Sequence, residues 1–334
     1  MKLGLGVGPL GAPGGERIIS LAKAAEDLGY DTIWCAEIYG TDCFTPLAWV
    51  GAHTSRIKLG TSIMQISARS PASAAMHAVA MDHLSNGRLI LGIGVSGPQV
   101  VEGWYGQPYP KPLARTREWL QIFRKIIARE EPVSFAGTHY QLPLDGGTGL
   151  GKPLKLMHHP LREHIPVYLG AEGPKNVALA AELCDGWIPM FLSPYRMAEQ
   201  YAEAMRIKGA EFEIAAAVPV VIDDDVDRAR AQIKQSVGFY VGGMGAKTFN
   251  VHKDHVSRMG FADAAQEIQD LFMAGKRDQA FAAVPDQLID EIALCGPKAR
   301  IRERLQGWKD SPVTQLNVGT ADLDTLRFFA EEVL

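Results

Sequence analysis

Three segments that follow short apolar runs carry residue types able to move a proton or bind an anion. Glu37 follows the run Thr32–Cys35, and a carboxylate in that position can orient a ligand or act as a general acid or base. The small residues Gly60–Ser62 let a planar ligand approach the backbone closely. The segment Gly170–Asn176 (GAEGPKN) follows the run Val167–Leu169. All three are candidates for a ligand site.

The segment Gly170–Asn176 has the pattern of an anion-binding turn. Pro174 stands where a helix begins, a position at which proline loses no hydrogen bond. Free N–H groups at a helix N-terminus and the helix dipole attract phosphate, and Lys175 adds positive charge. The same pattern also fits an ordinary strand–helix turn, and Glu37 fits an ion pair or cap equally well. The candidate residues of this turn are Gly170, Ala171, Glu172, Gly173, Pro174, Lys175 and Asn176.

The three candidate segments lie within a series of eight short apolar runs, and helical patterns occur between these runs. The runs predict strands at Leu3–Val7, Thr32–Cys35, Ile57–Met64, Leu89–Ile93, Val167–Leu169, Gly186–Pro189, Ile214–Ile222 and Val313–Val318. Helical spacing predicts helices at Glu16–Gly29, Phe44–Thr54, Ala72–Leu84, Leu113–Arg129, Lys175–Leu183, Tyr195–Lys208, 223–240, 263–274, 286–293, 297–309 and Leu323–Val333. Eight alternating units predict an α/β protein with a (β/α)8 TIM barrel, whose ligands bind at the carboxyl ends of the strands.

Two segments interrupt this alternation and are predicted to be insertions in one domain covering residues 1–334. The first, near 131–165, is rich in glycine and proline and contains a hairpin pattern at 133–142 (VSFAGTHYQL). The second, near 241–278, begins with an irregular stretch at 241–262. Because neither insertion carries a recognisable motif, the sequence does not identify the substrate.

A doubly wound open sheet is the alternative fold. Such sheets usually carry the GxGxxG dinucleotide fingerprint after the first strand. Here Gly6, Gly8 and Gly11 match it only loosely, and no acidic residue ends the second strand in a clear ribose-binding setting. We therefore favour the barrel.

Composition restricts the partners and the cofactors. The net charge of −4 and the absence of a basic stripe argue against nucleic acid. No apolar run approaches the roughly 20 residues that span a membrane, and no signal-peptide core is seen, so we expect a cytoplasmic protein. The cysteines lack metal-binding spacing and are expected to be reduced and mostly buried; they are Cys35, Cys43, Cys184 and Cys295. No metal site is predicted, because His252 and His255 have no obvious partner ligands in the sequence. Three tryptophans, Trp34, Trp49 and Trp187, are expected to lie in the core.

Several of these segments together resemble the bacterial luciferase-like monooxygenase superfamily. The similarity extends from Leu3 to the last helix and is most specific at SNGRLILGIG and at GAEGPKN followed by ALAAELCDGW. Within the superfamily the chain looks most similar to the branch that uses the deazaflavin coenzyme F420, that of methylenetetrahydromethanopterin reductase. The resemblance implies a (β/α)8 barrel with insertions, a homodimer, and a flavin or deazaflavin across the carboxyl ends of the strands.

The resemblance also implies roles for individual residues. A non-prolyl cis peptide at Ser62–Ile63 would form a bulge behind the ring system. The backbone of Val95, Ser96 and Gly97 would contact the ring and its side chain, and the amides of Gly170–Asn176 would bind the phosphate. Members of the family often have Asp-His or Glu-His after the second strand, whereas this chain has Glu37 and Ile38. Ile38 cannot transfer protons, so any acid must come from elsewhere.

These expectations favour an oxidoreductase that transfers hydride between reduced coenzyme F420 and a small organic substrate, with Glu37 as the candidate catalytic residue. An FMN-dependent monooxygenase is the first alternative, because reduced flavin reacts with oxygen and deazaflavin does not. A non-catalytic flavin-binding homologue is the second. A phosphate-binding barrel lyase or isomerase is a third, although Lys58 begins its strand, at the end opposite the one where chemistry occurs.

Overall fold

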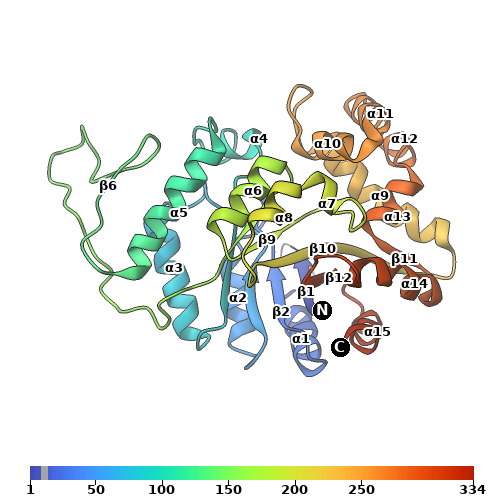
Figure 1. The fold of residues 1–334 in the computed structure, drawn as a ribbon, viewed down its shortest axis with the longest axis horizontal. Helices are drawn as coiled ribbons and strands as arrows, with labels where there is room; N and C mark the ends of the chain where they lie inside the picture. Colours follow the sequence, from blue (N-terminus) through green and yellow to red (C-terminus); the bar gives the residue numbers. More distant parts are fainter. Residues whose placement is uncertain (9–13) are drawn as a thin grey trace.

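The computed structural model describes residues 1–8 and 14–334 and contains a closed barrel of parallel strands surrounded by helices (Figure 1). Gly11 of the glycine-rich N-terminal segment lies outside the described residues. The eight barrel strands are β1 (Lys2–Gly8), β2 (Thr32–Cys35), β3 (Lys58–Thr61), β5 (Leu89–Gly94), β8 (Val167–Gly170), β9 (Gly186–Ile188), β10 (Glu213–Ile222) and β12 (Gln315–Gly319). They pair in that order, and β12 pairs with β1. The predicted (β/α)8 barrel is therefore confirmed.

Strand β10 is long enough to pair within the barrel and also with a strand outside it. Its first half joins β9 and β12 and so closes the barrel. Its last residues, Val220–Ile222, leave the ring and pair with β11 (Leu294–Gly296). The sequence did not predict β11, because three buried residues between two helices give too short a pattern.

Helices form the outer layer around the barrel. They are α1 (Gly14–Asp27), α2 (Phe44–Gly51), α3 (Pro71–Leu84), α5 (Pro112–Ala128), α6 (Pro174–Leu183), α7 (Met197–Gln200), α8 (Ala202–Ile207), α14 (Lys298–Lys309) and α15 (Leu323–Val333). In α5, Trp119, Phe123 and Ile126 recur at helical spacing and are buried against the barrel. The prediction of one continuous helix at Tyr195–Lys208 is wrong. The segment forms two short helices, the first beginning at Met197, with a break at Tyr201.

The predicted strand Ile57–Met64 is interrupted. Strand β3 ends at Thr61, and β4 (Met64–Gln65) resumes after the Ser62–Ile63 peptide, which is cis. Strand β4 pairs with the end of β5. The interruption places Ser62 and Ile63 at the carboxyl edge of the barrel.

Residues 226–293 form a helical cap with its own hydrophobic core, distinct from the core between strands and outer helices. The cap consists of α9 (Val226–Gly243), α10 (Val251–Val256), the π-helical turn η1 (Ser257–Phe261), α11 (Ala262–Met273), α12 (Arg277–Ala282) and α13 (Asp286–Ile292). The irregular stretch predicted at 241–262 is thus wrong from Val251 onward. Asn250 caps α10 by accepting from the amides of His252 and Lys253, and Gly260 supplies a kink at φ +92°. In Figure 1 the cap's orange helices lie on the opposite side of the barrel from the green 131–165 insertion, which carries the label β6 (Phe135–Ala136).

The 131–165 insertion contains the predicted hairpin, formed by β6 (Phe135–Ala136) and β7 (Gln141–Leu142). Arg162, near its end, pairs with the fully buried Asp82 of α3 and donates to the carbonyl of Leu89. This insertion is therefore attached to the outside of the barrel. A short helix that the sequence did not predict, α4 (Pro98–Val101), follows β5.

The tryptophans divide between the core and the surface. Trp34 fills the inside of the barrel with Tyr168 and Ile188, and Trp187 is buried as well, so both predictions are confirmed. Trp49 was expected in the core but is 53% exposed on α2, since only one face of that helix meets the barrel. Across residues 1–8 and 14–334, no helix is long and apolar enough to span a membrane.

Candidate functional site

The segments singled out in the sequence meet at one edge of the barrel. Strands β2, β3, β5 and β8 are consecutive neighbours, and the predicted site residues follow their carboxyl ends. The four segments are those at Glu37, Ser62–Ile63, Val95–Gly97 and Gly170–Asn176. Their juxtaposition is what a ligand site at a barrel mouth requires. The role of each residue as a ligand contact stays a prediction.

The Ser62–Ile63 peptide is cis, as the resemblance implied. The Ser62 amide donates to the Cys35 carbonyl at 2.7 Å. The Ile63 side chain packs into a space left by two glycines: a Cβ on Gly94 would lie 2.7 Å from Ile63 Cδ1, and one on Gly170 would lie 2.8 Å from Cγ2. The ends of β4, β5 and β8 therefore form one packed unit around Ile63.

The end of β5 has an unusual backbone. Ser96 has a φ of +60°, a left-handed conformation that residues other than glycine seldom adopt. Such residues are concentrated at ligand-binding sites. Gly97 follows as the N-cap of α4. The geometry supports the interpretation of Val95–Gly97 as a contact segment.

The β8–α6 turn has the features of an anion site. Gly173 is the N-cap of α6 without a capping side chain, and Pro174 is at the first helical position. Among the described residues, no acceptor is recorded for the amides of Gly173 and Lys175. A Cβ on Gly173 would meet no atom within 4 Å, so the space on that side of the turn's backbone is open. The turn therefore presents unpaired donors to open space.

Glu37 lies in a buried ion pair. Both of its carboxylate oxygens accept from Arg69 Nη1 at 2.8 Å, and the Cys43 thiol lies 3.1 Å from Oε2. Burial raises the pKa of Cys43, so that its thiol stays protonated. Burial opposes the charge of Arg69, but its bond to Glu37 holds the pKa of Arg69 above the ordinary value. The Glu37 carboxylate is thus occupied by partners, and the neighbouring Ile38 is half-buried.

The structure adds residues that sequence reasoning missed. His252 Nδ1 of α10 lies 2.7 Å from Oε1 of Glu172. His255 is buried and its Nε2 lies 3.0 Å from the Phe191 carbonyl, while the Tyr201 hydroxyl donates to the Glu172 carbonyl at 3.1 Å. His252 stands 80 positions from Glu172 in the chain, and no local pattern links the two. Within the described residues, no group of acidic, histidine or cysteine side chains is arranged to hold a metal.

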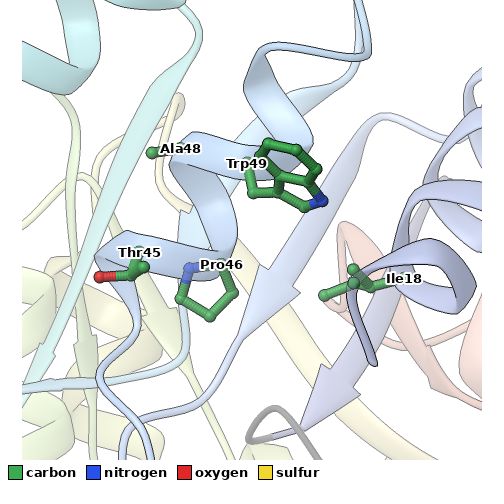
Figure 2. Close-up of a pocket in the computed structure, with 6 residues that line it drawn as sticks. Ile18, Thr45, Pro46, Ala48 and Trp49 are labelled. Carbon is green, nitrogen blue, oxygen red and sulfur yellow. The ribbon is translucent and has the colours of Figure 1, made fainter. Parts of the chain in front are cut away.

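A cavity of about 500 Å³ lies elsewhere, between helices α1 and α2 of the outer layer (Figure 2). Ile18 of α1 and Trp49 of α2 line it, together with Thr45, Pro46 and Ala48. Its lining is almost entirely apolar and has no convergent polar groups. Because orientation of a reacting ligand needs such groups, we place the chemistry at the strand ends and not in this cavity.

Comparisons with known proteins agree with this geometry. The family described as luciferase-like monooxygenase matches residues 4–315. A Mycobacterium tuberculosis protein provisionally named a coenzyme F420-dependent oxidoreductase is 50% identical over 99% of this chain and 98% of its own length. A solved structure of the coenzyme F420-dependent tetrahydromethanopterin reductase from Methanopyrus kandleri covers all of this chain and 99% of its own, with a TM-score of 0.78 and 22% identity.

A second solved structure carries a different cofactor. It is the oxygenating constituent of 3,6-diketocamphane monooxygenase from Pseudomonas putida, in complex with FMN. It matches with a TM-score of 0.68 and 19% identity, over all of this chain and 97% of its own. At these identities the two structures establish a shared fold only.

Proposed function

Because the chain belongs to the luciferase-like monooxygenase family, we propose that it is an oxidoreductase transferring hydride between coenzyme F420 and a small organic substrate. The observation that carries this proposal is the 50% identity, over nearly the full length of both chains, to the protein named for F420. When bound, the reduced deazaflavin supplies the hydride and the substrate accepts it. The chain's own residues hold and orient the reactants and exclude water from them.

The residues at the strand ends fit such a cofactor. The open approach at Gly173 leaves room for a phosphate at the amides of Gly173 and Lys175. The packed unit around Ile63 gives a fixed apolar surface against which a planar ring can lie. Ser96 and Gly97 lie between these two features along the barrel edge. These contacts support the proposed roles of Ser62–Ile63, Val95–Gly97 and Gly170–Asn176.

The ion pair changes the role that we propose for Glu37. With Arg69 on both oxygens, this carboxylate is better suited to holding the loop after β2 than to exchanging protons with a substrate. Replacing Glu37 with Gln separates the two roles. A loss confined to kcat at unchanged F420 affinity assigns proton transfer, whereas parallel losses of affinity and stability assign positioning.

The FMN-dependent monooxygenase is the second candidate, and the fold match to an FMN complex is the observation that favours it. Titration of the purified protein with F420 and with FMN, followed by fluorescence quenching, separates the two. Binding of F420 in the absence of FMN binding supports hydride transfer. Tight binding of FMN alone overturns it. Binding of either cofactor without turnover of any acceptor would identify a non-catalytic homologue.

The anion-binding turn is tested by two matched variants. Gly173→Asp and Gly173→Asn add side chains of nearly equal size into open space and differ in charge. We expect Gly173→Asp to abolish cofactor binding through repulsion of the phosphate, and Gly173→Asn to weaken it far less. Equal affinities of the two variants would refute the phosphate assignment. We further propose that the protein is cytoplasmic and homodimeric.

A further inference from the structure

The side chain of Glu172 is turned away from the anion site that its own backbone helps to form. Glu172 belongs to the β8–α6 turn, but Oε1 lies 2.7 Å from Nδ1 of His252 in the cap helix α10. The other oxygen is buried and has no hydrogen-bond partner among the described residues. Among the described residues, His252 is the side chain in ion-pair contact with this carboxylate, and the contact does not have hydrogen-bond geometry at Nδ1.

The backbone of Glu172 is held from the same side. Tyr201 Oη donates to the Glu172 carbonyl at 3.1 Å, and Arg258 Nη2 donates to it at 3.4 Å. In a trans peptide the C=O and the following N–H point in opposite directions. Contacts that hold the Glu172 carbonyl toward the cap therefore direct the Gly173 N–H away from it. The side chain and the carbonyl of Glu172 both fix the orientation of the turn's free amide.

Helix α10 is itself firmly placed. The Asn250 side chain caps it, and His255 Nε2 lies 3.0 Å from the Phe191 carbonyl in the loop after β9. The His252 ring lies edge-on to Tyr240, with centroids 4.9 Å apart. Because α10 is anchored to both the cap and the barrel, His252 presents Nδ1 to Glu172 from a fixed position.

Charge makes this contact matter for an anion. Burial opposes ionisation of Glu172, but His252, His255 and Arg258 hold its pKa below the ordinary value, so it carries a negative charge near neutral pH. A negative charge on the residue next to Gly173, whose amide is unpaired, repels a phosphate bound there unless a nearby group compensates that charge. His252 Nδ1, 2.7 Å from Oε1 of Glu172, is placed to do so.

We propose that His252 is a positioning residue of the β8–α6 turn: by holding Glu172, it sets the affinity of the turn for a phosphate-bearing ligand. The cap helix thereby takes part in ligand binding without touching the reacting atoms. The nature of the ligand rests on the function proposed above, whereas the contact itself rests on the distances among Glu172, His252 and Tyr201.

The test compares two substitutions that differ in the donor. His252→Phe keeps a ring against Tyr240 but lacks a donor, and His252→Asn keeps an amide nitrogen near the place of Nδ1. We measure the Kd for F420, for FMN and for inorganic phosphate by fluorescence quenching and calorimetry. We expect His252→Phe to weaken binding by roughly tenfold and His252→Asn by less than about threefold. Adding Glu172→Gln to His252→Phe should restore binding to within about threefold of the wild type.

The outcomes separate this proposal from the proposed function. If the wild type binds phosphate but neither cofactor, the proposed function fails. The role of His252 is then tested by the Kd values of the variants for inorganic phosphate alone. A wild type that does not bind phosphate overturns both the turn and the role of His252. If His252→Phe binds with unchanged affinity, or if His252→Phe and His252→Asn lose affinity equally, the proposed role of His252 is also overturned. If His252→Phe does not fold, His252→Gln, whose amide nitrogen replaces Nε2, takes its place in the comparison.

Discussion

Glu37 shows what a single residue's position in a sequence can and cannot indicate. Its place after β2 correctly predicts a carboxylate at the barrel edge. Its partner Arg69 stands 32 positions later and is 13% exposed as a side chain, so the pair is buried. No local sequence pattern links Arg69 to Glu37, because the two residues follow different strands, β4 and β2, and meet only in the folded barrel. The pair, and not an isolated acid, is the structural unit here.

This pair makes a prediction about stability. Arg69→Met should lower the free energy of unfolding by about 3 kcal/mol, because it leaves the buried Glu37 charge without its cationic partner. Urea unfolding followed by circular dichroism measures the change. The double variant Glu37→Gln/Arg69→Met removes the charge as well and should regain part of the loss. If Arg69→Met unfolds at the wild-type urea concentration, the pair does not stabilise the fold.

Ile63 makes a prediction about packing at the site. Gly94→Ala would bring its Cβ within 2.7 Å of Ile63 Cδ1, and overpacking of this kind costs about 1–3 kcal/mol. Ile63→Val removes that methyl group and should recover part of the loss in the double variant. Thermal unfolding measures the effect of each variant on stability, and the Kd for F420 measures its effect on cofactor binding. Gly173→Ala is the matched control: its Cβ meets nothing within 4 Å, so it should lower the melting temperature far less, by no more than the loss of a glycine N-cap.

At the scale of elements, the sequence predicts best where a periodic pattern is long. Helices such as α3 and α15 begin and end within one residue of the prediction. Ser70 caps α3 and Pro71 begins it, whereas Asp322 caps α15 and amphipathic spacing runs along it. Helix α10 was missed because its six residues, four of them histidine, lysine or aspartate, show little apolar periodicity. Its stability comes from the Asn250 cap and from contacts to Phe191 and Glu172, which lie far away in the sequence.

The anchoring of α10 predicts a dependence of stability on pH. Burial holds the pKa of His255 below its ordinary value, although the charge of Glu172 and the bond to the Phe191 carbonyl act in the opposite direction. Arg258 and His252, which also face it, favour the neutral ring. Unfolded His255 takes up a proton near pH 6.5, whereas the folded residue resists protonation. Stability is therefore complete above about pH 6.5 and falls as the pH drops below it, by up to about 1.4 kcal/mol per pH unit.

Urea unfolding of the wild type and of His255→Gln, at about pH 7.5 and about pH 5.5, measures this effect. The glutamine amide can still donate to the Phe191 carbonyl but does not titrate. We expect the wild type to lose more stability than the variant between the two pH values. Equal losses would show that His255 is not the group responsible.

For the whole molecule, the barrel could be predicted because eight strand–helix units repeat, and the closed parallel sheet confirms it. The cap could not be predicted, since its core depends on Val237, Ile268 and Leu288, three residues on different helices within residues 226–293. The same holds for the site. Strand ends indicate Gly170–Asn176 from local pattern alone, whereas the contribution of the cap to this turn exists only in the folded chain.

The last prediction concerns assembly. Helices α2 and α3 pack together and expose Trp49, Met76 and Leu84, large apolar side chains that a second copy of the chain would cover. Light scattering coupled to size exclusion should give twice the 36.3 kDa of one chain. Met76→Glu should shift the protein toward the monomer, because an interface core disfavours an unpaired charge. Leu150→Glu, at an exposed leucine of the 131–165 insertion, should not. A monomeric wild type at micromolar concentration would contradict the homodimer.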